Sequence, residues 1–408
     1  MRLLTSLLKK FIHNGELKLF DSKGRAHNFG TGQNGPSVTV RLHNAVLESK
    51  LARNPELYAA EAYMDGTLTF EDGSTCYDFL FLFSVNRGGL ASHSSQKMLR
   101  AIWRKMRRYQ QANPLGKAAK NVQHHYNLST ELYRLFLDED LHYSCAYFLD
   151  PENETLEQAQ ANKIRHAASK LKLEPGMTVA EIGAGWGAFA IYLAKLGAHV
   201  TSINVSDEQV KIAIQKAEEA GVADKIDFVI QDYREFEGKF DRVVSVGMME
   251  HVGVTYFEEY FNKVSDLLKD DGFAFIHAIG RMTPPGTTGP FIRKYIFPGG
   301  YVPALSETFA AIEQTGLWVA DMEVLRLHYY YTIKHWRERF EANRDQIADL
   351  YDERFCRMWE FYLCAVEMGF LHGSNMVFQF LMAKERDAVP IQRDYMFERE
   401  QELIKKGL

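Results

Sequence analysis

The pattern of hydrophobic and polar positions divides the chain into two regions. Between residues 15 and 85, positions 37–42 alternate as in a half-buried strand, and positions 45–64 have helical spacing. From about residue 160, short apolar runs alternate with helical stretches. The expected strands are 177–182, 198–203, 226–230, 242–246 and 272–276, and the expected helices are 188–196 and 209–220. Such alternation predicts a parallel sheet with helices on both faces.

The expected fold class is therefore α/β, with a Rossmann-like domain and a smaller N-terminal α+β domain. A chain of 408 residues is long enough for two domains. We expect the α+β domain at 1–110 and the larger domain at 111–408. Residues 1–12 predict an amphipathic first helix, because Lys9 and Lys10 interrupt the apolar stretch and no cleavage site follows.

The segment 97–120 has an unusual charge pattern, with eight basic residues and no acidic residue. Met98, Ile102, Met106 and Tyr109 recur at spacings of three and four, which places an apolar stripe on a basic helix. Such a helix can lie on an anionic lipid surface. A solvated linker whose apolar side packs on its own protein would have the same pattern, and both interpretations stay open.

Composition narrows the classes of partner and site. The chain has 48 basic and 53 acidic residues, a formal net charge of -5, which gives no reason to expect nucleic acid as a partner. Its four cysteines form no CxxC pair and no zinc spacing, so we expect no metal and a reducing, cytoplasmic setting. No apolar run approaches the roughly 18 to 20 residues that cross a bilayer. Any contact with a membrane is therefore expected to be peripheral.

A glycine-rich segment, Glu181–Gly187, lies where the first strand of the larger domain turns into its first helix. Glycines there let the backbone approach a ligand and adopt positive φ. The spacing does not match the dinucleotide pattern G-x-G-x-x-G, and no acid ends the second strand, so nicotinamide binding is disfavoured. An acid before the turn, with Gly183 and Gly185 in it, instead favours a site for the methionyl part of S-adenosylmethionine.

Asp232 and Tyr233 follow the third strand and supply an acid for an adenine amino group and a ring for stacking. In isolation Asp232 could be a helix N-cap and Tyr233 a core aromatic residue. Their position after the glycine turn favours the cofactor interpretation.

Several strings along the chain, in this order, resemble the cyclopropane-fatty-acyl-phospholipid synthases and their mycolic acid relatives. The resemblance runs from about Glu61 to about Lys384 and covers most of the chain. The strings are Glu61–Gly66, His125-Tyr126, Tyr133, Phe136–Asp138, His142–Phe148, the glycine turn, Ser206–Gln209, Val246–Gly253, His277–Gly280, Phe291–Tyr301 and His328-Tyr329. Asn204, Ala184 and the pair Tyr330-Tyr331 depart from the family's usual residues.

The resemblance implies an S-adenosylmethionine methyltransferase domain and a smaller lipid-associated N-terminal domain. It implies a bound bicarbonate, with the catalytic positions Cys145, Glu250, His277, Ile279 and Tyr329. It also implies that Tyr143, Ser144, Asn204, Gln209 and Tyr233 join Glu181, Gly183, Gly185 and Asp232 around the cofactor. Taken alone, His277 could be a core histidine, Tyr329 a packing residue in a run of tyrosines, and Cys145 a buried small side chain.

The chemistry explains why such groups are needed. An alkene that attacks the methyl carbon of a sulfonium leaves positive charge on the acyl chain, and a base must then remove a proton before a ring closes. An anion in a water-excluded site stabilises that cation. Bicarbonate fits this role if His277 and the Tyr329 hydroxyl fix it while Glu250 accepts its proton.

The expected function is transfer of a methylene unit from S-adenosylmethionine to the double bond of an unsaturated acyl chain in a membrane phospholipid. A fatty acyl C-methyltransferase that stops at a methyl or methylene branch remains the alternative, since it would use the same cation and base. A silent lipid-binding protein and a small-molecule methyltransferase fit less well. We also expect a homodimer on the inner face of the membrane, with no nucleic-acid partner.

Overall fold

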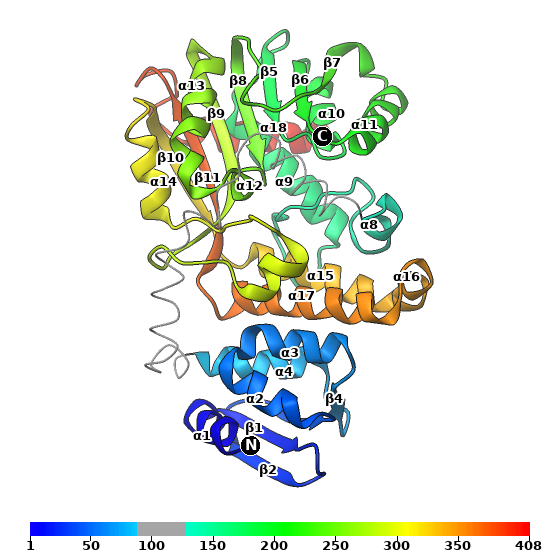
Figure 1. Ribbon diagram of the computed structural model, residues 1–408. Helices are drawn as coiled ribbons and strands as arrows, with labels where there is room; N and C mark the ends of the chain where they lie inside the picture. Colours follow the sequence, from blue (N-terminus) through cyan, green and yellow to red (C-terminus); the bar gives the residue numbers. More distant parts are fainter. Residues whose placement is uncertain (88–127) are drawn as a thin grey trace. The chain divides into compact units, whose positions relative to one another are not determined.

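The computed structural model describes residues 1–87 and 128–408, which form two compact units (Figure 1). Among the described residues, the first unit comprises 1–87, Thr287–Pro298 and Ile333–Ser374. The second unit comprises 128–286, Gly299–Thr332 and Asn375–Leu408. The basic segment 97–120 and the pair His125-Tyr126 lie outside the described residues. The prediction gave each domain one continuous segment, whereas the first unit takes two further segments from the C-terminal half.

A four-stranded sheet of order β2-β1-β3-β4 forms one layer of the first unit. Its strands are β1 (Gly15–Phe20), β2 (Ala26–Gln33), β3 (Ser37–Leu42) and β4 (Leu68–Glu71), and its first helices are α1 (Arg2–Phe11), α2 (Ala45–Arg53), α3 (Pro55–Met64) and α4 (Cys76–Val85). The predicted amphipathic first helix is confirmed, with Leu4, Leu8 and Phe11 buried. The predicted helical stretch 45–64 is two helices, because Pro55 starts the second one.

The C-terminal segments complete the first unit. They contribute a short π-helix (Ile292–Ile296), most of α15 (His328–Ala342), α16 (Arg344–Leu350) and α17 (Glu353–Leu371). α17 packs on α3 and α4. The Tyr63 hydroxyl donates to Glu360 at 2.6 Å, and the Ser84 hydroxyl bonds His372 Nδ1 at 2.8 Å. Residues almost three hundred positions apart therefore share one core.

Two of the strings that carry the resemblance meet in the first unit. Glu61 accepts from Lys294 Nζ at 2.6 Å and from the Tyr295 hydroxyl at 2.9 Å. These contacts join Glu61–Gly66 to Phe291–Tyr301. The two strings therefore have a structural relationship that their sequence positions do not reveal.

A seven-stranded sheet of order β10-β11-β9-β8-β5-β6-β7 forms the centre of the second unit. The strands are β5 (Thr178–Ile182), β6 (His199–Asn204), β7 (Ile226–Ile230), β8 (Phe240–Val246), β9 (Leu268–Arg281), β10 (Trp318–Leu325) and β11 (Asn375–Ala383). Only β11 runs antiparallel to its neighbours in this described sheet. The predicted parallel sheet is confirmed, and β10 and β11 are additional strands that the pattern did not indicate.

Helices cover both faces of this sheet (Figure 1). One face packs against α9 (Leu156–Lys170), α10 (Ala188–Lys195), α11 (Asp207–Glu219) and α18 (Asp394–Lys405). The other face packs against α12 (Met249–Val252), α13 (Phe257–Leu267) and α14 (Leu305–Ile312). A further helix, α8 (Thr130–Phe136), precedes the loop that holds the string His142–Phe148. The doubly covered sheet explains why its strands are continuous apolar runs in the sequence.

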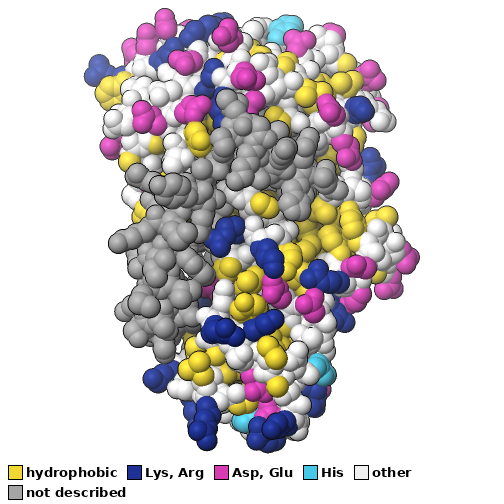
Figure 2. All heavy atoms as spheres, viewed as in Figure 1, with side chains coloured by type: hydrophobic (Ala, Val, Ile, Leu, Met, Phe, Trp, Pro, Cys, Tyr) yellow, Lys and Arg dark blue, Asp and Glu magenta, His cyan; other side chains and the backbone are white. Residues whose placement is uncertain are grey.

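The surface of the second unit carries both signs of charge. In the view of Figure 2, acidic and basic side chains of the described residues are interspersed over it. No helix among the described residues is long and apolar enough to cross a membrane.

Candidate active site

The glycine turn follows β5 and begins α10. Gly183, Gly185 and Gly187 have φ values of 91°, 52° and 85°, a region that side chains with a Cβ rarely adopt. The backbone N–H groups of Gly183 and Ala184 donate to the carbonyl of Ile203 at 2.9 and 3.1 Å. A Cβ built at Gly185 would meet no protein atom within 4 Å. The turn is therefore fixed by β6 and leaves open space in front of it.

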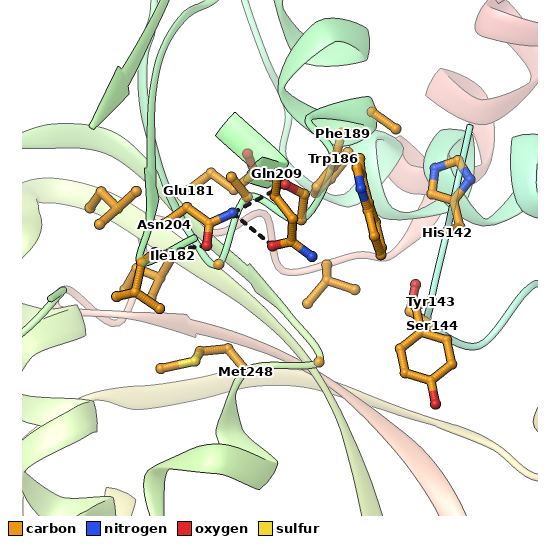
Figure 3. Close-up of a pocket in the computed structure, with 18 of the residues that line it drawn as sticks. His142, Tyr143, Ser144, Glu181, Ile182, Trp186, Phe189, Asn204, Gln209 and Met248 are labelled. Carbon is orange, nitrogen blue, oxygen red and sulfur yellow. Dashed lines mark hydrogen bonds between the residues drawn. The ribbon is translucent and has the colours of Figure 1, made fainter. Parts of the chain in front are cut away.

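This space is a pocket at the carboxyl ends of β5, β6 and β8 (Figure 3). The sheet order places β5 between β6 and β8, so the pocket lies at the point where the strand order reverses. All nine predicted cofactor residues line it: Tyr143, Ser144, Glu181, Gly183, Gly185, Asn204, Gln209, Asp232 and Tyr233. The structure therefore brings together every residue of the predicted cofactor set.

Asn204 and Gln209 line the pocket beside the turn, and their side chains point toward each other (Figure 3). Asn204 Nδ2 donates to the Gly185 carbonyl and to Gln209 Oε1, both at 3.1 Å. Ser206 caps α11, and its side chain accepts from the Gln209 backbone N–H. Gln209 is buried, and its Nε2 has no hydrogen-bond partner among the described residues. An unsatisfied buried donor in a pocket wall is suited to a ligand acceptor.

Glu181 is the buried acid at the end of β5, where its carboxylate accepts from the Ser202 hydroxyl. Burial raises the pKa of Glu181 to about 8, although that hydroxyl and nearby Lys163 lower it. A hydroxyl or ammonium group of a ligand would stabilise the ionised form.

Lys163 and His142 line the same pocket. Lys163 was not identified from the sequence, and His142 was named only as the start of the string His142–Phe148, with no role in the site. Lys163 Nζ on α9 donates to the Ser144 hydroxyl at 3.2 Å, and burial lowers the Lys163 pKa to about 8. Asp138 bonds His142 Nδ1 at 2.7 Å, and His142 Nε2 has no partner among the residues described. A single lysine in a helix carries no pattern, and a place in a string does not show which side chains line a pocket, so only the fold identifies these two contacts.

Asp232 and Tyr233 line the pocket just after the end of β7. Asp232 Oδ1 and Oδ2 accept from the Arg234 side chain at 2.9 and 2.7 Å. Burial raises the pKa of Asp232, but the hydrogen bonds and charge of Arg234 outweigh it and leave the pKa below its usual value. Tyr233 is buried and packs edge-on against Tyr260. Asp232 therefore remains an ionised acceptor whose orientation is set by Arg234.

Glu250 and Ile279 are in direct contact. The Ile279 backbone N–H donates to Glu250 Oε1 at 2.6 Å, while Glu250 Oε2 is buried with no hydrogen-bond partner in the described chain. Burial raises the pKa of Glu250 to about 7, although the Ile279 amide lowers it. The N–H of Ile279 therefore orients the carboxyl group of Glu250, a role that the sequence did not indicate.

His277 lies two residues before Ile279 on β9 and is 2% exposed. Gln379 Nε2 lies 3.2 Å from its Nδ1. Burial, with a smaller effect of Lys163, Lys170 and His166, lowers the pKa of His277 to about 3. The imidazole is therefore neutral at physiological pH.

The segment that contains Cys145 is held against the first turns of α15. The Ala146 N–H donates to the Thr332 hydroxyl at 3.0 Å, and the Phe148 N–H donates to His328 Nδ1 at 3.0 Å. Tyr329 lies between these two α15 contacts in the sequence. Burial raises the pKa of the Cys145 thiol, which therefore stays protonated. A protonated thiol is a poor nucleophile.

The catalytic candidates do not line the cofactor pocket themselves. Lys163 interacts electrostatically with residues of both sets. Its charge lowers the pKa of Glu181 in the pocket and the pKa values of the catalytic candidates Cys145 and His277. The roles of Cys145, Glu250, His277, Ile279 and Tyr329 remain predictions.

Comparisons with known proteins identify the family to which the chain is similar. The family model described as mycolic acid cyclopropane synthetase matches residues 114–380. A probable fatty acid methyltransferase of Pseudomonas putida is 40% identical over 275 residues, 65% of this chain and 69% of that protein. The cyclopropane-fatty-acyl-phospholipid synthase of Escherichia coli (strain K12) is 33% identical over 360 residues, 87% of this chain and 90% of that protein.

A solved structure of a cyclopropane synthase is also similar to this chain. The cyclopropane synthase MmaA2 from Mycobacterium tuberculosis aligns with a TM-score of 0.63 and 31% sequence identity. The alignment covers 67% of this chain and 99% of that chain.

Proposed function

This chain belongs to the mycolic acid cyclopropane synthetase family, and we propose that it closes a cyclopropane ring on an unsaturated acyl chain of a membrane phospholipid. Family membership makes it an S-adenosylmethionine-dependent methyltransferase. The identity of the acceptor and the closure of the ring are the parts that we propose.

The lined pocket fits S-adenosylmethionine. Its methionyl part would lie against the open space at Gly185, near the buried groups of Glu181 and Lys163. Gln209 Nε2 and His142 Nε2, which lack partners among the described residues, offer one donor and one acceptor. When bound, the cofactor supplies an electrophilic methyl group on a sulfonium. The residues of the pocket hold that group in place and exclude water from it.

The observation that carries the proposal is the buried Glu250 carboxyl group, which is held by the backbone of β9 two residues beyond the neutral His277. The Ile279 N–H fixes one oxygen, and the other has no partner in the described ranges. With a pKa of about 7, Glu250 can both take up and release a proton near neutral pH. Glu250, His277 and Tyr329 would hold a bicarbonate ion, which supplies a base when bound. The acyl chain loses one proton for each ring that closes, and Glu250 receives it from the site.

The phospholipid acceptor is supported by the extent of the alignments. The Escherichia coli enzyme, whose name specifies a fatty-acyl phospholipid, aligns with 87% of this chain. Nearly all of MmaA2 aligns with only 67% of it. The additional length includes the N-terminal region. We propose that this region makes peripheral contact with the inner face of the membrane and that the enzyme does so as a homodimer.

A second candidate is a fatty acyl C-methyltransferase that leaves a methyl or methylene branch. It is favoured by one observation: identity to the Pseudomonas putida protein, named a probable fatty acid methyltransferase, is 40%, against 33% to the Escherichia coli enzyme. Both reactions need the same cation and base, so the residues of the site do not distinguish them.

The test is mass spectrometry of fatty acyl methyl esters after incubation with S-adenosylmethionine and unsaturated phospholipid vesicles. Ring closure gives a product that is heavier by one CH2 and has no remaining double bond. Glu250→Gln is expected to abolish this product while binding of S-adenosylhomocysteine persists, because Glu250 does not line the cofactor pocket.

A heavier product that still contains an alkene, or one with a saturated methyl branch, would contradict cyclopropanation and support the fatty acyl C-methyltransferase. Intact cofactor binding with no product from any unsaturated lipid would contradict both and leave a lipid-binding role.

A further inference from the structure

A buried line of hydrogen bonds lies behind His277. Gln379 on β11 is the direct cross-strand partner of His277 on β9. Side chains two positions away on each strand, Phe275 and Leu381, pack in the core on the α9 side of the sheet. Because side chains alternate between faces, His277 and Gln379 also point to that side. Gln379 Nε2 and His277 Nδ1 are 3.2 Å apart, and both side chains are nearly fully buried.

Lys170, at the end of α9, determines which way the Gln379 amide faces. Its ammonium group donates to Gln379 Oε1 at 2.5 Å. An ammonium group has three donors and no acceptor, so the amide oxygen must face Lys170. The amide NH2 group therefore faces His277. The reverse orientation would place two donors against each other in a buried site, where an unsatisfied polar group costs about 1–3 kcal/mol.

Lys170 is itself fixed by a carboxylate. Glu323 Oε2 accepts from Lys170 Nζ at 2.5 Å and contacts His166 Nε2 at 2.7 Å. Glu400 Oε1 lies 3.2 Å from the other ring nitrogen of His166. Although burial lowers the His166 pKa, its two carboxylate contacts raise the value above normal. Lys170 and His166 therefore alternate with the carboxylates of Glu323 and Glu400 behind Gln379. Burial lowers the pKa of Lys170, but the ion pair with Glu323 opposes this shift and favours the ammonium form that donates to Gln379.

The orientation of the Gln379 amide determines which nitrogen of His277 carries the proton. A ring nitrogen that faces an N–H donor must be an acceptor, so Nδ1 carries no proton. The proton of the neutral ring is then on Nε2, which becomes the only N–H donor of the imidazole. Lys163, Lys170 and His166 are the charged or titratable groups that act on His277, and all of them oppose its protonation, in agreement with a neutral ring.

We propose that Gln379, oriented by Lys170, is a positioning residue that fixes His277 as the neutral Nε2–H tautomer. In the active enzyme this tautomer donates a hydrogen bond to the anion that accepts the acyl proton. The catalytic consequence rests on the proposed function. The tautomer itself does not, and it can be measured without any substrate.

The first measurement is NMR of the protein with 15N-labelled histidine, in long-range 1H–15N spectra. His277 is identified among the 14 histidines by the signal that is missing in His277→Gln. We expect a protonated Nε2, an unprotonated Nδ1, and shifts that stay constant from about pH 6 to about pH 8. A protonated Nδ1, averaged shifts or titration in this range would overturn the proposal without any variant.

The variants add a test of cause. Gln379→Glu places an acceptor opposite Nδ1, and we expect His277 to gain a second proton and to titrate in the observed range. Gln379→Met removes the donor and should give averaged tautomer shifts. Unchanged His277 shifts in either folded variant would contradict the role of Gln379. Gln346→Glu makes the same change of charge on exposed α16 and should leave the His277 signals unchanged.

Kinetics separate positioning from a purely structural role. We expect Gln379→Met to lower kcat on the order of tenfold to a hundredfold, as loss of imidazole-orienting partners does at metal sites, with unchanged KM for S-adenosylmethionine. A fall in S-adenosylhomocysteine affinity together with kcat would indicate a structural defect and overturn the positioning role. If the wild-type enzyme made no ring but showed the expected tautomer, the proposed function would fail and the tautomer assignment would stand.

Discussion

At the scale of single residues, burial determines the chemistry that each titratable group can perform. Glu181 and Glu250 are both buried carboxyl groups with raised pKa values, about 8 and about 7. Glu181 has a hydroxyl partner and faces the cofactor pocket, whereas Glu250 is held by a backbone N–H. Cys145 is buried in the same region, but its raised pKa keeps it protonated and unreactive. The same desolvation therefore creates a base at one position and an inert thiol at another.

The pKa of Glu250 predicts the pH dependence of catalysis. Glu250 accepts a proton only as the carboxylate, and with a pKa of about 7 only about a tenth of it is ionised at pH 6. We expect kcat to rise about tenfold per pH unit below pH 7 and to level off above it. The rate should be measured with saturating S-adenosylmethionine. Under this condition, a change in cofactor affinity caused by titration of Glu181 alters KM and not kcat.

Glu181→Gln is the matched control, since it removes the buried carboxyl group with a raised pKa that lines the pocket. The same ascending limb is expected in this variant. A flat profile of kcat between about pH 5.5 and about pH 8 would exclude Glu250 as the group that must be ionised.

At the scale of elements, the glycine turn depends on the close approach of α10 and α11. Gly187 is the N-cap of α10, with φ of 85°. A Cβ there would lie 2.7 Å from Ala213 Cβ on α11. Glycine at this position therefore serves both the turn and the packing of the two helices, while Gly185 faces open space.

Gly187→Ala is expected to destabilise the protein by two effects. The left-handed conformation costs about 1–2 kcal/mol with a Cβ, and overpacking against α11 adds about 1–3 kcal/mol. Gly221→Ala is the control, because its φ is 69° but its Cβ would meet nothing within 4 Å. Guanidinium unfolding should show the larger loss for Gly187→Ala, and Ala213→Gly should recover part of it. Equal losses at both positions would show that contact with Ala213 is unimportant.

At the scale of the whole molecule, chain order and compact units do not coincide. α3 and α4 pack against α17, which lies almost three hundred residues later in the chain. Arg337 Nε donates to the fully buried Glu367 at 2.7 Å, and the Arg337 guanidinium lies over the Tyr77 ring. The N-terminal elements therefore complete their core with C-terminal helices.

A fragment of residues 1–110, the domain expected from the sequence, should consequently not fold by itself. It lacks α17 and would expose apolar side chains of α3 and α4 such as Leu82. We expect a broad, low thermal transition by circular dichroism, and a sharper one when a peptide of residues 333–374 is added. Cooperative unfolding of the fragment alone near the temperature of the full chain would show that α17 is dispensable.

The sequence by itself determined the α/β class of the second unit, the position of the glycine turn and five residues that line the pocket, Glu181, Gly183, Gly185, Asp232 and Tyr233. These features are encoded locally, since strand and helix periods and glycines before a helix can be recognised within about ten residues. The resemblance supplied four further pocket residues, Tyr143, Ser144, Asn204 and Gln209. It also supplied Glu250, His277, Ile279, Cys145 and Tyr329, and the catalytic use of these residues is still a prediction.

Only the tertiary structure decided which groups are buried together. Lys163 and Gln379 have no local pattern, and the string His142–Phe148 did not show that His142 lines the pocket. β10 and β11 were missed because their pairing with each other and with β9 joins segments far apart in the chain. The discontinuous first unit was missed for the same reason. The pKa values of Glu250 and His277 likewise depend on desolvation by segments far away in the chain, because the dielectric environment of a side chain is a property of the folded protein.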